Sequence, residues 1–224
     1  VSVRELARRA AAGEPAGSVG EDYAYMGLDT CAGCGLCSTA CPVGIDTGDL
    51  TRRLRGRKLA GTARAVNAWT GNNFGTLANA SRLGLKVGHA VSSILGDHFL
   101  SRVSGGAWKK HMPYAGRAPA VRTTAGDPVV YFPGCGGRIF GPSASGDAQL
   151  GDVIIELLVR AGYAPRLPEG FDKLCCGQML ASKGMAEEAE GMSDTLEAAL
   201  MKASENGRYP VIMDASACST RMQE

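Results

Sequence analysis

The stretch "DTCAGCGLCSTACPVGIDTGDL", residues 29–50, decides the first half of the fold because it gathers four of the chain's eight cysteines within eleven positions. They are Cys31, Cys34, Cys37 and Cys41, and Pro42 follows directly. Gaps of two residues let three consecutive loop thiolates turn toward one metal centre. Gly33 and Gly35 lie between these thiols and suit the tight turns of such a loop.

The spacing C-x2-C-x2-C-x3-C-P is that of a bacterial ferredoxin run, which holds cubane iron–sulfur clusters. Zinc also binds C-x2-C pairs, but zinc sites combine two such pairs that lie far apart. The spacing therefore favours a 4Fe-4S cluster over zinc or unliganded thiols. Two assignments stay open. In the first, Cys41 serves a neighbouring cluster whose partner run lies upstream, as in two-cluster proteins. In the second, all four thiols hold one cluster.

Composition and charge restrict the classes of protein to which the chain can belong. The chain has 224 residues, of which 45% are hydrophobic and 21% charged, as in a globular protein with one large or two small domains. A net charge of +2 gives no argument for nucleic-acid binding. No stretch is long and apolar enough to predict a transmembrane segment, and no export signal is recognisable. Clustered thiols without an export signal predict a cytoplasmic protein, with peripheral attachment at the inner face of the membrane left open.

The first region, residues 1–115, is predicted to be helical. Residues 2–12 and 44–57 have helical character, and Asp46 or Thr47 is expected to cap the second of these helices. Residues 59–112 alternate apolar and polar positions at helical period, without clear strands. One apolar face of this segment is formed by Leu77, Leu83, Val87, Val91 and Leu95.

The second region, residues 128–224, is predicted to be an α/β unit, after a Pro- and Gly-rich linker over 116–127. The apolar runs at 128–132 and 209–213 indicate strands buried on both faces of a parallel sheet. A helix near 150–158 and a second helix over 186–205 are expected between them. The stripe predicted to be buried on the first helix comprises Leu150, Val153, Ile154, Leu157 and Leu158.

The other four cysteines follow the predicted strands and one turn. Cys135 and Cys218 come directly after the two strands, so a parallel sheet brings them to the same carboxyl edge, where α/β folds place ligand sites. Cys175 and Cys176 are adjacent, which suits a polynuclear centre better than one zinc ion. We expect a metal or cluster at these four cysteines. A reducible disulfide and buried structural thiols are the alternatives.

Catalytic machinery is not recognisable elsewhere in the sequence. "GCGGRIFG" at 134–141 fits neither the dinucleotide fingerprint nor the phosphate-binding loop. His89, His98 and His111 are isolated from one another and from the cysteines, so we interpret them as ordinary surface or packed histidines. No catalytic residues are therefore predicted in this chain.

Several motifs together resemble one family. "YAYMGLDTCAGCGLCSTACPVGIDTGDLTRRLR", residues 23–55, resembles the second ferredoxin-type run of the FAD-linked D-lactate dehydrogenase family. "YFPGCGGRIFGP", "KLCCGQMLASKG" and "VIMDASAC" resemble the first half of its cysteine-rich CCG domain, which glycolate oxidase iron–sulfur subunits and heterodisulfide reductase share. The resemblance runs from about residue 20 to the end of the chain. One departure is Arg221, which stands where such a block often has its last cysteine.

The resemblance implies a function and several partners. The fold is expected to be α + α/β, with a helical ferredoxin-type iron–sulfur domain followed by an α/β CCG half-domain. An FAD domain that oxidises the 2-hydroxy acid and a first ferredoxin-type run are expected upstream, and a second CCG half downstream. The chain begins with Val and is thus expected to be a piece of a longer polypeptide. It would pass electrons from FAD to an acceptor and would not oxidise lactate alone. The rival interpretations are a stand-alone iron–sulfur subunit of a glycolate oxidase or heterodisulfide reductase-like complex and a non-redox zinc module.

Overall fold

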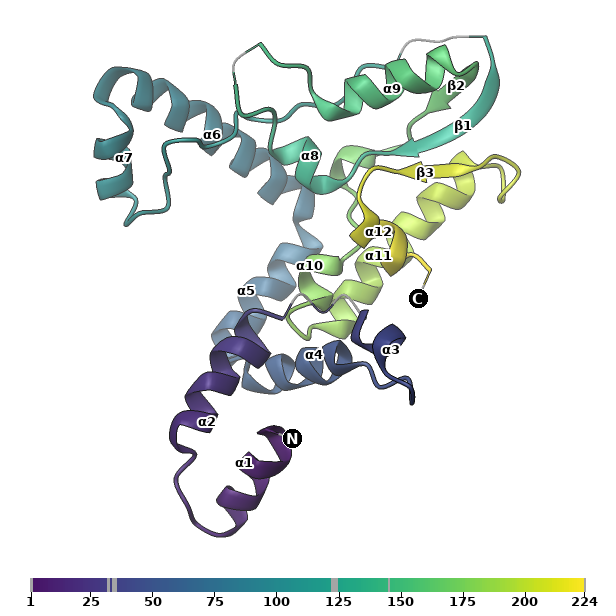
Figure 1. Ribbon diagram of the computed structural model, residues 1–224. Coiled ribbons are helices and arrows are strands. Elements are labelled where there is room, and N and C mark those ends of the chain that lie inside the picture. Colours follow the sequence, from purple (N-terminus) through teal and green to yellow (C-terminus); the bar gives the residue numbers. More distant parts are fainter. Residues whose placement is uncertain (1, 32, 34–35, 122–124, 145, 224) are drawn as a thin grey trace. The chain divides into compact units, whose positions relative to one another are not determined.

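The computed structural model describes residues 2–31, 33, 36–121, 125–144 and 146–223 (Figure 1). Over these residues the protein is mostly helical with one small parallel sheet, in agreement with the predicted α plus α/β class. Contacts divide the chain into two units. The first comprises Val1–Asn67 with Met179–Ala189, and the second comprises Ala68–Gln178 with Glu190–Glu224. The sequence predicted two domains with a boundary at residue 115. Contacts alone do not show which parts of a chain fold independently, so this boundary stays a prediction.

The first unit is helical before and after the cysteine run. Its elements are α1 (Ser2–Ala11), α2 (Gly17–Asp22), the π-helix η1 (Tyr23–Asp29), α3 (Leu36–Ala40) and α4 (Thr47–Lys58), followed by α5 (Gly61–Asn72), which has residues in both units. The helices α1 and α4 confirm two predicted helices. The sequence did not predict α2, which forms next to Gly and Pro residues that lower helix propensity and which has no buried residue.

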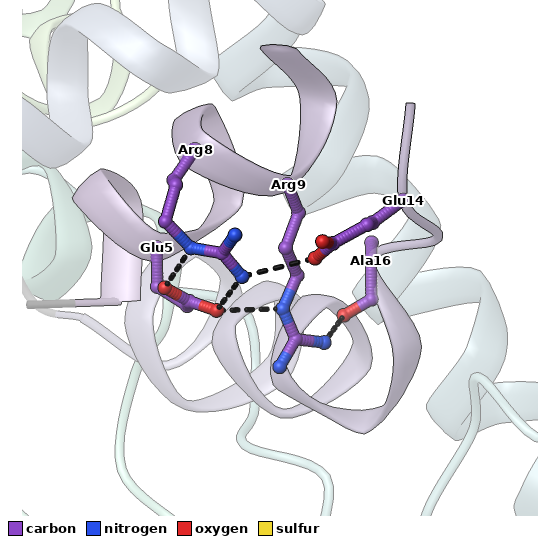
Figure 2. Close-up of polar contacts among 5 residues, drawn as sticks. All are labelled: Glu5, Arg8, Arg9, Glu14 and Ala16. Carbon is purple, nitrogen blue, oxygen red and sulfur yellow. Dashed lines mark hydrogen bonds and ion pairs between the residues drawn. The ribbon is translucent and has the colours of Figure 1, made fainter. Parts of the chain in front are cut away.

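The end of α1 is tied to the loop that follows it by a small group of charged side chains, shown in Figure 2. Arg8 and Arg9 both donate to the Glu5 carboxylate, at 3.0 Å and 2.8 Å, and these bonds lower the pKa of Glu5 to about 2. Arg8 also reaches Glu14 at 2.9 Å, and Arg9 donates to the Ala16 carbonyl at 3.0 Å. The group orients the chain as it leaves α1, but it is solvent-exposed and contributes little to stability.

The start of α4 is capped as the sequence predicted. Asp46 has an extended backbone, and its carboxylate accepts a hydrogen bond of 2.7 Å from the Gly48 N–H. This bond satisfies one of the backbone donors that every helix start leaves without an intrahelical acceptor. The Asp46 cap therefore sets where the loop of the first cysteine run ends.

The second unit holds the sheet and most of the remaining helices. Its first elements are α6 (Phe74–Leu95), α7 (Asp97–Val103), β1 (Asp127–Phe132), α8 (Cys135–Ile139), α9 (Leu150–Arg160) and β2 (Tyr163–Arg166). They are followed by η2 (Phe171–Lys173), α10 (Gln178–Ala181), α11 (Ala186–Ala203), β3 (Val211–Met213) and α12 (Ser216–Arg221), with α10 and α11 divided between the units. The structure confirms both predicted strands and both predicted helices of this region, but β3 is not buried on both faces as predicted, since Val211 is 39% exposed and the other two residues of the strand are only partly buried. The structure also adds β2, which was not predicted.

The strands pair in parallel in the order β2-β1-β3, so β1 is the central strand (Figure 1). Residues Val129 to Phe132 of β1 are completely buried. Val129 and Tyr131 pack with residues of α9, whereas Val130 and Phe132 pack with residues of α11. Because successive strand side chains point to opposite faces, helices cover the sheet on both sides, which explains the unbroken apolar run of the strand.

The buried face of α9 differs from the predicted stripe. Ile155 and Leu158 are buried, whereas Leu150, Val153 and Leu157 are exposed. The prediction was wrong for these three positions because α9 has apolar residues on several faces, and periodicity does not tell which of them the sheet covers. The same holds for α6, whose predicted apolar face is largely exposed at Leu83, Val87 and Leu95, while Phe74, Ala78 and Leu85 are buried.

The predicted linker begins inside the second unit. The Gly116 N–H donates to the Ile139 carbonyl at 2.8 Å, and the Arg117 N–H donates to the side chain of Gln149 at 3.0 Å. Residues 122–124 of the linker lie outside the described residues. Among the helices of the described residues, none combines the length and apolar character needed to cross a bilayer.

Gly184 lies against the backbone of α4 in the first unit, so its substitution tests this packing. Gly184 has a φ of +82°, and an added Cβ would lie 2.1 Å from the Arg52 carbonyl oxygen and 2.4 Å from the Gly56 nitrogen. We expect Gly184→Ala to lower the free energy of unfolding by about 3 kcal/mol, measured by urea denaturation. As a matched control, Gly191→Ala adds its Cβ in open space within α11 and should raise stability by about 0.5–1 kcal/mol. Equal effects of the two substitutions would contradict the close approach at Gly184.

Candidate functional site

The first cysteine run lies between η1 and α4. Cys31, Cys37 and Cys41 are partly exposed free thiols. Cys34 lies outside the described residues, so its predicted role as a ligand stays a prediction. Cys31 follows closely on η1, and Cys37 belongs to the short helix α3.

Main-chain N–H groups are directed at two of these sulfurs. The Thr47 N–H donates to the Cys37 Sγ at 3.2 Å, and the same thiol donates to the Asp46 carboxylate at 3.3 Å. Backbone N–H groups of Ile45 and Val43 bond to the Cys41 sulfur and lower the pKa of its thiol. Donors of this kind favour the thiolate over the thiol, because they compensate negative charge on sulfur.

Arg55 holds the backbone on the N-terminal side of the run. Its guanidinium donates to the carbonyls of Leu28, Cys31 and Ser182, each at 2.7 Å. All four residues belong to the first unit. One planar, five-donor side chain thereby satisfies carbonyls that the end of η1 and the loop leave without helical partners. Nothing local in the sequence distinguishes Arg55 from its neighbouring arginines.

The first run fits a thiolate-held cluster in its donor chemistry. Its described cysteines are partly exposed, and backbone N–H groups bond to the sulfurs of Cys37 and Cys41, where those at Cys41 favour its thiolate. Among the residues that the structure describes, no three His, Cys, Asp or Glu side chains surround a common point at which a metal ion could sit. The predicted ligand set Cys31, Cys34, Cys37 and Cys41 includes one residue beyond that description and stays a prediction.

The second cysteine set gathers at the carboxyl edge of the sheet. Cys135 begins α8 after β1, and Cys218 lies in α12 after β3, while Cys175 and Cys176 lie in the turn between η2 and α10. The Cys135 and Cys175 sulfurs are 3.9 Å apart, and the Cys176 and Cys218 sulfurs are 3.2 Å apart. In the strand order β2-β1-β3, the chain places β2 on one side of β1 and then crosses to place β3 on the other side. The strand order therefore reverses between β1 and β3, and α/β sheets bind ligands at such a reversal point.

Hydrogen bonds between these sulfurs divide them into donors and acceptors. Bonds from Cys175 and Cys218 lower the pKa of Cys176, and a bond from Cys175, aided by the charge of Arg138, lowers the pKa of Cys135 to about 7. The pKa values of the donors Cys175 and Cys218 are raised by the same bonds and by burial. These hydrogen bonds therefore favour protonated thiols at Cys175 and Cys218 and negative charge at Cys135 and Cys176.

Asp214 joins β3 to the turn after β1. Its carboxylate accepts hydrogen bonds from the Gly134 N–H at 2.5 Å and from the Tyr131 hydroxyl at 2.8 Å. Burial and the bond to Asp214 raise the pKa of Tyr131. This clamp aligns the two strand ends that carry Cys135 and Cys218. Its sequence signal was an acidic residue directly after an apolar run that predicts a strand.

Arg138 is a buried cation beside the thiols. Its side chain is only 4% exposed, lies over the Phe132 ring, and donates to the carbonyls of Phe171 and Leu174. No ion pair joins it to a carboxylate in the described part of the chain, and its Nε has no hydrogen-bond partner there. Burial lowers the pKa of Arg138, and the thiols of Cys135 and Cys175 offset this effect. The sequence signal for Arg138 was its position one helical turn after Cys135.

The thiols of the second set are arranged as two pairs. Two thiolates on one zinc ion are about 3.8 Å apart, given a zinc–sulfur distance of about 2.3 Å and tetrahedral angles. The Cys135–Cys175 separation of 3.9 Å is close to that value, whereas the Cys176–Cys218 separation of 3.2 Å is shorter. Among the described residues, no three such side chains converge on one point at which a metal ion could sit. The metal or cluster predicted at these four cysteines stays a prediction.

One histidine has a defined environment away from both cysteine sets. The His89 ring stacks on Tyr114 with ring centroids 4.1 Å apart and meets the edge of Trp108 at 5.1 Å. Its Nε2 lies 3.1 Å from the Pro113 carbonyl oxygen. These contacts confirm that His89 is a packed histidine.

Comparison with known proteins gave no match to a family model, to a curated protein or to a solved structure. The resemblance to the D-lactate dehydrogenase family therefore rests on the motifs in the sequence alone.

Removing the Asp214 carboxylate tests the clamp at the sheet edge. Asp214→Ala leaves the Gly134 N–H and the buried Tyr131 hydroxyl without their acceptor, so we expect a loss of about 2–4 kcal/mol in the free energy of unfolding. Asp214→Asn keeps one acceptor oxygen and should cost less. Asp147→Ala, at an exposed position, is the matched control and should leave stability within about 0.5 kcal/mol. If Asp214→Ala left the free energy of unfolding unchanged, the Asp214 hydrogen bonds would not contribute to stability.

Arg55 allows a similar test in the first unit. Lysine has one ammonium group and cannot reach three carbonyls at once, so Arg55→Lys should destabilise the protein by about 2 kcal/mol in chemical denaturation. Arg57→Lys changes an exposed arginine of the same helix and should have no measurable effect. Equal stability of the two variants would show that the hydrogen bonds of Arg55 do not stabilise the loop.

Proposed function

We propose that this chain is the iron–sulfur electron-transfer portion of a flavin-linked D-2-hydroxyacid dehydrogenase of the D-lactate type. The observation that carries the proposal is the C-x2-C-x2-C-x3-C-P run, in which backbone N–H groups are directed at the sulfurs of Cys37 and Cys41. Such donors stabilise thiolate ligands and influence the reduction potential of a cluster that they hold.

The residues of the first run have distinct roles in this proposal. Cys31, Cys34 and Cys37 would hold one 4Fe-4S cluster, and Cys41 would serve a neighbouring cluster. A bound cluster supplies one-electron transfer between a flavin and an acceptor. The Thr47 N–H and the Asp46 carboxylate orient the Cys37 side chain, since both bond to its sulfur. Arg55 fixes the Cys31 carbonyl and with it the start of the loop.

Oxidation of the hydroxy acid belongs to an FAD domain outside this chain. That part of the proposal rests on the resemblance of residues 23–55 and of the three CCG blocks. The second cysteine set, Cys135, Cys175, Cys176 and Cys218, would lie toward the electron acceptor. Its position at the reversal point of a parallel sheet supports a functional site there.

Cluster assembly is the direct test. After anaerobic reconstitution, the isolated chain should bind less than one full 4Fe-4S cluster, because three of its thiols lack the fourth ligand that a partner run supplies. Co-expression with the coding sequence that precedes Val1 should restore iron, acid-labile sulfide and the EPR signal of the reduced cluster. Cys37→Ser should abolish this signal, whereas the matched control Cys135→Ser should leave the iron bound by the first run unchanged.

The other outcomes separate the rival interpretations. A full 4Fe-4S cluster in the isolated chain would show that Cys41 closes the site locally. A preceding sequence without an FAD domain would favour a stand-alone iron–sulfur subunit. Bound zinc without sulfide would overturn the proposal in favour of a zinc module.

A further inference from the structure

The Cys135–Cys175 pair joins a solvent-accessible thiol to a buried one. Cys135 is partly exposed, whereas Cys175 is 4% exposed. Their sulfurs are 3.9 Å apart although the residues are 40 positions apart in the chain. The other pair of the set is shielded, since Cys176 is 1% and Cys218 is 6% exposed. A small solute therefore meets Cys135 first.

The surroundings of Cys135 favour a reactive sulfur. The Arg138 guanidinium lies near it and is held by the carbonyls of Phe171 and Leu174. A fixed, buried cation stabilises negative charge on a neighbouring sulfur. Oxidation-sensing cysteines combine an accessible sulfur with a resolving cysteine close by, as Cys135 and Cys175 do.

We infer that Cys135 is a peroxide-reactive thiol and that Cys175 resolves it to an intramolecular disulfide. This inference concerns only the second unit and does not depend on the iron–sulfur proposal. The disulfide would link the start of α8 to the turn between η2 and α10. It would give the α/β unit a reversible response to hydroperoxides.

The chemistry balances in two steps. In the first step, the Cys135 thiolate attacks one oxygen of the hydroperoxide, the O–O bond breaks, and Cys135 becomes a sulfenic acid as hydroxide or alkoxide leaves. In the second step, the Cys175 sulfur attacks the Cys135 sulfur, an S–S bond forms, and water leaves with the sulfenic oxygen and the Cys175 proton. The sulfurs must approach from 3.9 Å to about 2.05 Å, which a side-chain rotation and a small shift of the turn can provide.

Peptide mapping tests this inference on the whole chain. The reduced protein is treated with stoichiometric hydrogen peroxide, alkylated and mapped by mass spectrometry without reduction. We expect a linked pair of tryptic peptides, one with Cys135 and the other with Cys175, and a loss of about 2 Da relative to their summed masses. Because Cys175 and Cys176 share a tryptic peptide, two variants assign the bond. Cys175→Ser should lose the link, and the matched control Cys176→Ser should keep it.

A second measurement keeps the inference falsifiable if a variant folds poorly. In Cys175→Ser the sulfenic acid on Cys135 should accumulate and react with dimedone severalfold more than in the unaltered chain. A link between Cys176 and Cys218 instead, sulfinic acid on Cys135 without a link, or no reaction would each overturn the inference. So would a metal ion held by these thiols that protects them from peroxide. The mapped peptides exclude the first run, so its iron content does not affect the result.

Discussion

The parallel pairing of β1 with β3 is the constraint on which the α/β unit depends. It places Tyr131 opposite Ile212 and Phe132 opposite Met213, so that both strands end at the same edge. The Asp214 carboxylate then accepts hydrogen bonds from the Gly134 N–H and the Tyr131 hydroxyl. These bonds fix the turn after β3 relative to the end of β1. The cysteines after β1 and β3 are brought to one place by this register, although 82 residues separate them in the sequence.

The first unit uses side-chain-to-backbone bonds to hold its cysteine run. An irregular loop cannot satisfy its own carbonyls as a helix does, so other groups must bond to them. Arg55 does this for Leu28 and Cys31, and the Asp46 carboxylate does the corresponding work for the N–H of Gly48. Both residues belong to α4 or to its cap, so this single helix orders the two ends of the run.

Much of this organisation could be predicted from local patterns. The helices α1, α4 and α11, the strands β1 and β3, and the Asp46 cap each have a signal within a few residues. The strand β2 does not, because Tyr163–Arg166 is a short edge strand that contains Pro165 and has only one buried residue. The buried face of α9 could not be predicted either, since several of its faces are apolar and the sheet decides between them.

The contacts of Arg55, Arg138 and Asp214 could not be predicted from the sequence, because their partners lie far away in the chain. Arg55 reaches Ser182, Arg138 reaches Phe171 and Leu174, and Asp214 reaches Tyr131. Close spacing singled out the first group of cysteines in the sequence, and their positions at strand ends and in a turn singled out the second group. Neither signal identified the polar groups around the cysteines, because the tertiary structure brings these groups there from distant parts of the chain.

The two cysteine sets differ in how their negative charge is compensated, and this difference separates their chemistry. In the first run, backbone N–H groups bond to the sulfurs of Cys37 and Cys41, and the described cysteines are partly exposed. In the second set, the thiols bond mainly to one another, beside the buried guanidinium of Arg138. Sulfurs that already share protons are suited to exchange electrons by forming a bond, because the two partners are in contact before any oxidant arrives.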